Sequence, residues 1–167
     1  AHGAHFAFHP DLPISALEAG ADLTVQSTHK TLSAFTQASM LHVNGDRIDH
    51  DRISQSLQLV QSTSPNYLLL ASLDAACEQM ATEGKALMER TLELSNQARS
   101  RLQSIPNLSV LDSGQFFALD RTRLTVTVSN LGIDGFTADE ILHQTLGITA
   151  ELPSFQHLTF ILSLGNT

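Results

Sequence analysis

The feature that most constrains the fold is a long amphipathic tract between residues 66 and 104. Apolar side chains recur in it at steps of three and four residues, the period of an α-helix with one buried face. The stripe consists of Leu70, Leu73, Cys77, Met80, Leu87, Thr91, Leu94, Ala98 and Leu102. We therefore predict one long helix, with Gly84 as the place for a bend or interruption and Cys77 as a core thiol rather than a nucleophile.

The residues before this tract predict two short strands around a polar loop. Residues 23–26 and 40–43 are apolar, β-leaning runs of strand length, and the second run ends at an Asn-Gly-Asp turn. A helix is expected to follow through Val60, with Asp51 as its N-cap.

After the tract, the hydrophobic period changes from that of a helix to that of strands. Apolar or β-branched runs of strand length occupy residues 108–111, 124–128, 148–152 and 158–162. Between the second and third runs, Thr137-Ala138-Asp139-Glu140 has the pattern of a capping box at the start of a helix. Strands joined by a helix after one long helix predict a small α+β unit.

The polar loop after residue 26 carries the chemistry of interest. In Ser27-Thr28-His29-Lys30, one amine stands beside hydroxyl and imidazole groups that donate to phosphate oxygens. A Lys amine forms a Schiff base with an aldehyde, which is how pyridoxal 5'-phosphate is held covalently. The alternative is a solvated surface lysine. Because Lys is scarce in this chain and the flanks of Lys30 are apolar and small, we instead expect a desolvated, nucleophilic amine.

Two further groups of polar residues leave alternatives open. Thr63 and Ser64 are either simple loop hydroxyls or caps of the long helix that present its N-terminus to an anion. His2, His5 and His9 form a histidine-rich start that a metal module would also have, but no Cys or carboxylate completes a ligand set nearby. For His9 we favour an ordinary loop histidine with backbone partners, and we predict no metal site.

Three segments in this order resemble the Orn/Lys/Arg decarboxylases, which are pyridoxal phosphate enzymes of the aspartate aminotransferase fold (fold type I). They are Ala1-His2-Gly3-Ala4-His5-Phe6, Ser27-Thr28-His29-Lys30 continuing through Gln37-Ala38-Ser39-Met40, and Thr63-Ser64-Pro65-Asn66-Tyr67. The resemblance implies an α/β chain in three parts. Residues 1–65 would end a large, mainly parallel-sheet domain, residues 66–104 would be the interdomain helix, and residues 105–167 would form the small C-terminal domain.

The resemblance also implies roles for individual residues. Lys30 would be the Schiff-base lysine, and Ser27 and His29 would be neighbours of the phosphate. Ala1 would pack on the pyridine face and His2 would hydrogen-bond the phenolic oxygen. A hydroxyl of Thr63 or Ser64 would reach the phosphate of a neighbouring subunit, so the expected assembly is a homodimer or higher homo-oligomer with its active sites between subunits.

The implied reaction is the decarboxylation of arginine, lysine or ornithine to an amine of polyamine biosynthesis. Because one fold serves several chemistries, an aminotransferase or an acyl-condensing enzyme remains an alternative. So does an inactive fragment or interaction domain. The family's Asp that pairs with the pyridine nitrogen would lie two residues before Ala1, so we interpret this chain as a C-terminal fragment that lacks the N-terminal part.

Composition limits the remaining classes of function. The formal net charge is −8 without clusters of Lys and Arg, which argues against nucleic-acid binding and suits a cationic substrate. No stretch is long and apolar enough for a transmembrane span, so no membrane partner is expected. A single Cys excludes an internal disulfide and fits a reducing compartment, which favours the cytoplasm.

Overall fold

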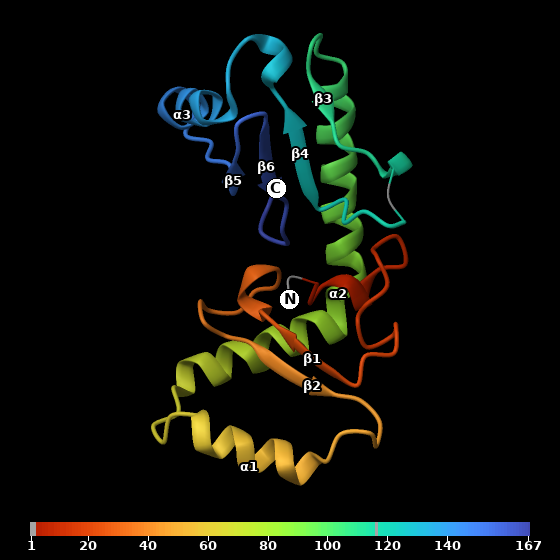
Figure 1. The fold of residues 1–167 in the computed structure, drawn as a ribbon, viewed down its shortest axis with the longest axis vertical. Helices are drawn as coiled ribbons and strands as arrows, with labels where there is room; N and C mark the ends of the chain where they lie inside the picture. Colours follow the sequence, from red (N-terminus) through yellow and green to blue (C-terminus); the bar gives the residue numbers. More distant parts are fainter. Residues whose placement is uncertain (1–2, 116) are drawn as a thin grey trace. The chain divides into compact units, whose positions relative to one another are not determined.

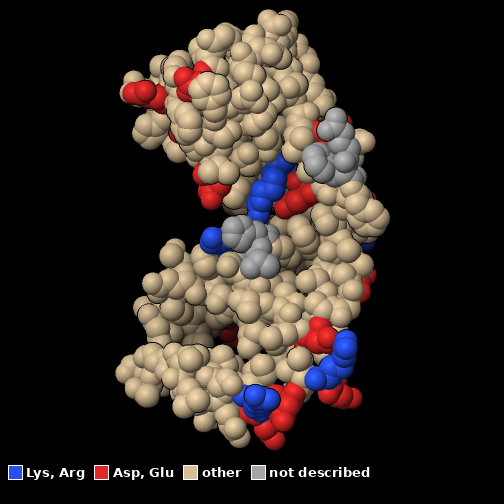
Figure 2. Space-filling model, in the orientation of Figure 1, with Lys and Arg blue, Asp and Glu red and all other residues tan. Residues whose placement is uncertain are grey.

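The computed structural model describes residues 3–115 and 117–167, and these fall into two compact units. The first unit ends at Met88 and the second begins at Glu89, both within one helix, α2 (Tyr67–Gln103). No helix in the described ranges combines the length and the apolar character needed to cross a membrane. On the face drawn in Figure 2, uncharged residues cover most of the surface, and the charged side chains occur in small groups.

The first unit is built around a two-stranded antiparallel ribbon, β1 (Leu23–Gln26) and β2 (Met40–Val43) (Figure 1). Leu23 pairs with Val43 and Gln26 with Met40, so the loop with Lys30 connects the two strands. Both predicted strands are confirmed. The remaining elements of this unit are η1 (Phe6–Phe8), η2 (Thr28–Lys30), α1 (His50–Val60) and the first part of α2. No parallel strand pair occurs in the described part of this unit, so the expected mainly parallel sheet is not seen here.

Helix α2 confirms the predicted long helix, but its buried face differs from the predicted stripe. The buried positions are Ala76, Met80, Gly84, Met88, Thr91, Leu92, Ser95 and Arg99. Cys77 is exposed, so its prediction as a core thiol is wrong. Met80 and Thr91 of the predicted stripe are buried, and five of its other members are half-buried. The stripe missed Gly84, Ser95 and Arg99 at the centre of the packed face because these residues are small or polar.

Gly84 neither ends nor interrupts α2, contrary to one of the predicted possibilities. A Cβ atom added at this glycine would lie 3.0 Å from Cδ1 of Phe8 and 3.1 Å from Cε of Met80. The missing side chain therefore lets η1 approach the helix closely, a packing reason that the local sequence does not reveal.

The second unit is an antiparallel four-stranded sheet in the order β3-β4-β6-β5, with helices packed against it (Figure 1). Its elements are β3 (Ser109–Val110), η3 (Ser113–Gln115), β4 (Arg123–Thr127), η4 (Ser129–Leu131), α3 (Gly135–Leu146), β5 (Leu152–Pro153) and β6 (His157–Ile161). Buried residues alternate along β4, where Leu124 pairs with Phe160 and Val126 with Leu158. The predicted α+β character is confirmed, although the strand expected at 148–152 shrinks to β5.

Two predicted helix caps are wrong for the same physical reason. The N-cap of α1 is Asp49 rather than Asp51, because the Asp49 carboxylate accepts the N–H groups of Asp51 and Arg52. At α3, the cap is Asp134 rather than Thr137, which instead donates to the Asp134 carboxylate. Several capping residues stand close together in both segments, and the one with extended backbone geometry takes the role.

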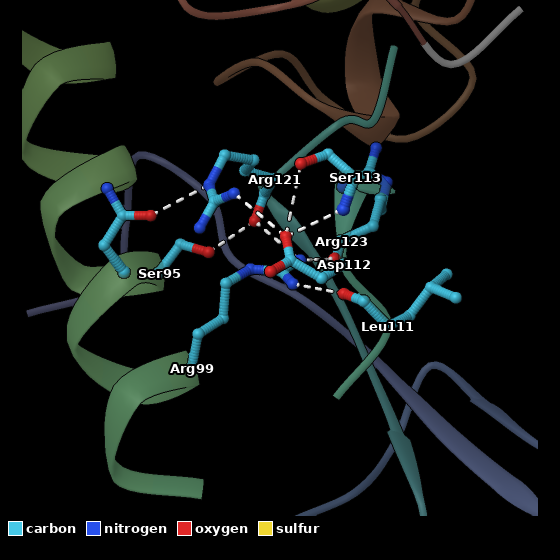
Figure 3. A network of polar contacts seen from close by, with 8 residues as sticks. Ser95, Arg99, Leu111, Asp112, Ser113, Arg121 and Arg123 are labelled. Carbon is cyan, nitrogen blue, oxygen red and sulfur yellow. Dashed lines mark hydrogen bonds and ion pairs between the residues drawn. The ribbon is translucent and has the colours of Figure 1, made fainter. Parts of the chain in front are cut away.

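Arg99 ties α2 to the sheet of the second unit (Figure 3). Only 3% of this residue is exposed, and its guanidinium donates to the carbonyls of Leu111, Arg121 and Arg123, at 2.6 Å for Leu111. The Ser95 hydroxyl also donates to the Arg121 carbonyl. Burial lowers the pKa of the Arg99 guanidinium, which still keeps its proton at neutral pH. The buried charge of Arg99 is thus stabilised by backbone carbonyls at the ends of β3 and β4.

Candidate active site

The lysine segment leaves β1 as a single turn of 3-10 helix. The N–H of Lys30 donates to the carbonyl of Ser27 at 3.2 Å, and the N–H of Thr31 to the carbonyl of Thr28 at 3.3 Å. Residues three apart lie on the same face of a 3-10 turn. Thr28 and Thr31, 2% and 7% exposed, fill the inward face, so His29 and Lys30 lie on other faces of the turn.

Lys30 is exposed in the described chain, contrary to the expectation of a desolvated amine. The 3-10 turn explains the difference, because it gives the inward positions to the two threonines. The small and apolar residues that suggested burial follow Lys30 in the same loop. Among residues 32–39, the buried side chain is that of Ala38, which is 2% exposed. The lysine therefore lies where a ligand or another part of the protein can reach it.

His29 is held by the far end of the same loop. The carbonyl of Ala38 accepts the backbone N–H of His29 at 3.1 Å and lies 2.7 Å from ring Nδ1. These two contacts join the start of the loop between β1 and β2 to its end. Ring Nε2 makes no hydrogen bond within the described residues and is left for another partner.

Ser27 precedes the 3-10 turn and occupies its N-cap position, yet its side chain makes no capping hydrogen bond. A serine before such a turn often bonds its own backbone, but no such bond of Ser27 occurs in the described structure. A half-buried hydroxyl next to Lys30 remains available to an anionic group.

Thr63 and Ser64 lie exposed in the connection between α1 and α2. They do not cap α2, because the side chain of Asn66 accepts the N–H groups of Leu68 and Leu69 at 3.0 and 3.3 Å. Ser64 borders a hollow of about 530 Å³ that Gln37, Ala38 and Ser39 also line. Ser64 therefore lies near the end of the lysine loop, but Lys30 does not line this hollow.

The histidine-rich start is described only in part. Ala1 and His2 lie outside the described residues, so the structure does not bear on their expected roles. His5 is 2% exposed and its ring meets that of Phe6 edge-on, with 4.7 Å between centroids. His9 accepts the N–H of Asp11 at Nδ1, as expected of a loop histidine. In the ranges 3–115 and 117–167, no three His, Cys, Asp or Glu side chains are grouped as metal ligands.

Sequence reasoning missed the residues that hold the loop in place. Phe35 donates its N–H to the hydroxyl of Ser72 on α2 at 3.2 Å, and Ala38 donates to the carbonyl of Phe35 at 2.9 Å. Gln37 lies between them with a φ of 79°, one of two non-glycine residues with positive φ in the described chain. No glycine or asparagine marked this turn, so the sequence contained no usual signal for it.

Comparison with known proteins identifies the family. Residues 1–127 match the family model described as "Orn/Lys/Arg decarboxylase, major domain". The chain belongs to the Orn/Lys/Arg decarboxylase family. It is 38% identical over its whole length to an arginine decarboxylase of Bacillus subtilis, of which it covers 35%. It is also 37% identical over 93 residues, 55% of this chain, to an inducible lysine decarboxylase of Escherichia coli, of which 12% is covered.

A solved structure extends the family match to the fold. The crystal structure of a lysine decarboxylase from Francisella novicida aligns with 98% of this chain at a TM-score of 0.84 and 26% identity. That alignment covers 29% of the Francisella chain. The chain thus spans about a third of the length of the Bacillus and Francisella decarboxylases.

Proposed function

We propose that the protein to which this chain belongs decarboxylates a basic amino acid with the help of pyridoxal 5'-phosphate. The observation that carries the proposal is the turn after β1. In this turn Lys30 is an exposed residue, the Ser27 side chain makes no capping hydrogen bond and the His29 ring is held by Ala38. These are the groups that a phosphorylated aldehyde requires. We favour arginine as the substrate, because the arginine decarboxylase of Bacillus subtilis is 38% identical along the whole chain, whereas the lysine decarboxylase of Francisella novicida is 26% identical.

Lys30 has the covalent role in this proposal. Its amine would hold the aldehyde of pyridoxal phosphate covalently and would exchange places with the amine of the substrate in each cycle. The cofactor would supply the conjugated ring that takes up the electron pair left on the α-carbon when carbon dioxide departs.

The polar neighbours of Lys30 would hold and orient the cofactor. Ser27 donates its hydroxyl to the phosphate, and His29 approaches the phosphate with its ring. Through the family resemblance, we also propose that Ala1 packs on the pyridine face and that His2 hydrogen-bonds the phenolic oxygen. The same resemblance supports residues 1–65, 66–104 and 105–167 as the end of the large domain, the interdomain helix and the small domain.

A second subunit would complete each site. Large apolar side chains are exposed where α1 ends and α2 begins, on both sides of Thr63 and Ser64: Leu59, Val60, Tyr67 and Leu68 are 87%, 80%, 77% and 70% exposed. Exposed apolar groups of this size are typical of surfaces that bury against another protein. We propose that a partner subunit covers them and that a hydroxyl of Thr63 or Ser64 reaches that subunit's phosphate.

Borohydride reduction of the full-length protein tests the covalent role. Reduction converts the double bond to a stable amine, and peptide mass spectrometry should find the pyridoxyl group on Lys30. Lys30→Ala should remove the label and lower the rate of carbon dioxide release by about 10³-fold or more, since covalent catalysis is lost.

Lys85→Ala is the matched control, because Lys85 is the only other lysine of this chain and lies on α2. It should keep both the label on Lys30 and the activity. A label on Lys85, or full activity of Lys30→Ala, would overturn the proposal. Carbon dioxide release from arginine, lysine and ornithine identifies the substrate, whereas formation of a keto acid without carbon dioxide would indicate an aminotransferase.

A further inference from the structure

The loop between β1 and β2 determines which nitrogen of His29 is available to a ligand. The carbonyl oxygen of Ala38 only accepts hydrogen bonds, and it lies 2.7 Å from Nδ1 of the ring. We infer that Nδ1 of His29 carries the proton and that Nε2, a bare lone pair in the neutral ring, is the atom that meets the phosphate. This inference rests on the proposed function, because it concerns the same cofactor.

A bare Nε2 accepts a hydrogen bond and cannot donate one to a phosphate oxygen. A phosphate in its dianionic form has no proton to donate either, so we expect Nε2 to take up a second proton from solvent when this form binds. The resulting N–H···O contact joins opposite charges, which makes it shorter and stronger than a neutral hydrogen bond. Lys30 is the charged residue next to His29 in the chain. The rest of the loop, residues 31–39, carries no titratable side chain.

The structure also assigns positioning residues for this ring. Ala38 is buried at 2% exposure, and its N–H donates to the carbonyl of Phe35 at 2.9 Å. Gln37 precedes Ala38 with a φ of 79°, the value that the third residue of a type II turn takes. Phe35 in turn donates to the Ser72 hydroxyl on α2. We therefore assign Gln37 and Ser72 as the residues that aim the Ala38 carbonyl at Nδ1.

The first test reads the ring directly in the full-length protein without cofactor. Ring-¹⁵N-labelled histidine gives separate signals for nitrogens with and without a proton, and His29→Asn identifies the signals of His29 by their loss. In the neutral ring we expect a proton on Nδ1 and none on Nε2, and after loading with pyridoxal phosphate a proton on both. A proton on Nε2 alone before loading, or a bare Nε2 after loading, overturns the inference.

The second test separates holding the loop from holding the phosphate. In His29→Asn the amide takes the place of Nδ1 and still donates to Ala38, but nothing replaces Nε2. We expect its affinity for pyridoxal phosphate to fall roughly tenfold to a hundredfold, the loss of one hydrogen bond between charged groups. Its affinity for pyridoxal, which has no phosphate, should stay as in the wild type. Equal losses for both ligands, or no loss for either, would contradict the role of Nε2.

The third test addresses the positioning residues with a matched pair. Gln37→Gly keeps the positive φ at no steric cost and should retain the wild-type protonation of the His29 ring. Gln37→Val disfavours that backbone conformation and should release Ala38, so that both tautomers appear in the ¹⁵N spectrum. If the two variants have the same spectrum, Gln37 has no positioning role.

Failure of the inference and failure of the proposed function give different results. If the wild-type protein binds no pyridoxal phosphate at all, the proposed function fails, while the spectrum without cofactor still decides the tautomer of His29. If the wild type binds the cofactor and His29→Asn binds it equally well, the function stands and the inference is wrong.

Discussion

Asp134 shows at the scale of one residue how a carboxylate defines the start of a helix. It accepts the N–H of Thr137 at 2.9 Å and the hydroxyl of the same residue at 3.0 Å. The backbone hydrogen bond from Thr137 is the main cause that lowers the pKa of Asp134, because it favours the charged form.

We predict that Asp134→Ala lowers the Tm by about 3 °C at neutral pH, as loss of an N-cap does. A lowered pKa in the folded state means stabilisation that is present above the unfolded-state pKa and is lost as the pH falls through the folded-state value. The difference in Tm between wild type and variant should therefore shrink in acid. Thermal unfolding followed by circular dichroism over a pH series measures it.

Asp46→Ala is the control for this series, because Asp46 is exposed and caps no helix. Its difference from the wild type should be small and without a comparable trend with pH. A difference for Asp134→Ala that persists unchanged in acid would contradict the assignment of the cap to the ionised carboxylate.

At the scale of elements, the second half of α2 depends on one buried cation. Arg99 donates to carbonyls at three positions of the segment 111–123, and the Ser95 hydroxyl also donates to one of them, that of Arg121. Removing the guanidinium leaves buried acceptors unsatisfied, which costs more than the average net value of a hydrogen bond.

We predict that Arg99→Met lowers the free energy of unfolding by about 3 kcal/mol, since several buried carbonyls lose their donor. Arg99→Lys should recover part of this loss, because an ammonium keeps the charge but not the planar fork. Denaturant unfolding of the full-length protein gives these values. Arg101→Met, an exposed arginine on the same helix, should change stability by less than about 0.5 kcal/mol. Equal effects at both positions would show that Arg99 contributes only as a surface charge.

At the scale of the whole molecule, the proposed site between subunits is testable by complementation. Thr63→Ala combined with Ser64→Ala should impair one protein, and Lys30→Ala should inactivate another. Suppose that the hydroxyls serve the partner's cofactor. In a mixed dimer, one site then takes Lys30 from the double variant and both hydroxyls from the Lys30→Ala variant, so it is intact. The other site lacks both Lys30 and the hydroxyls.

We predict that co-expression of these two variants restores roughly a quarter of wild-type activity, as half of the dimers are mixed and each has one intact site. Carbon dioxide release by the purified mixture measures it. Each variant co-expressed with itself is the control and should stay impaired. Failure to restore activity in demonstrated mixed dimers would mean that the hydroxyls act within their own subunit or not at all.

Much of the fold followed from local patterns. The strands β1, β2, β4 and β6 and the helix α2 were predictable because their hydrophobic period and turn residues lie within a few positions of each other. The lysine segment was also recognisable, since the order of hydroxyl, imidazole and amine groups is itself a local pattern. The sequence alone thus determined which elements exist and where the candidate chemistry lies.

The tertiary structure alone decided which side of each element is buried and which atoms are left for a ligand. Cys77 is exposed while Arg99 and Ser95 are buried, because the chain that packs on α2 supplies carbonyls that satisfy polar groups. Gln37 adopts a left-handed turn, and Ala38 aims its carbonyl at His29, because Ser72 holds the loop from a distant position in the chain. Burial and hydrogen-bond satisfaction depend on contacts between residues far apart in sequence, and no local pattern encodes them.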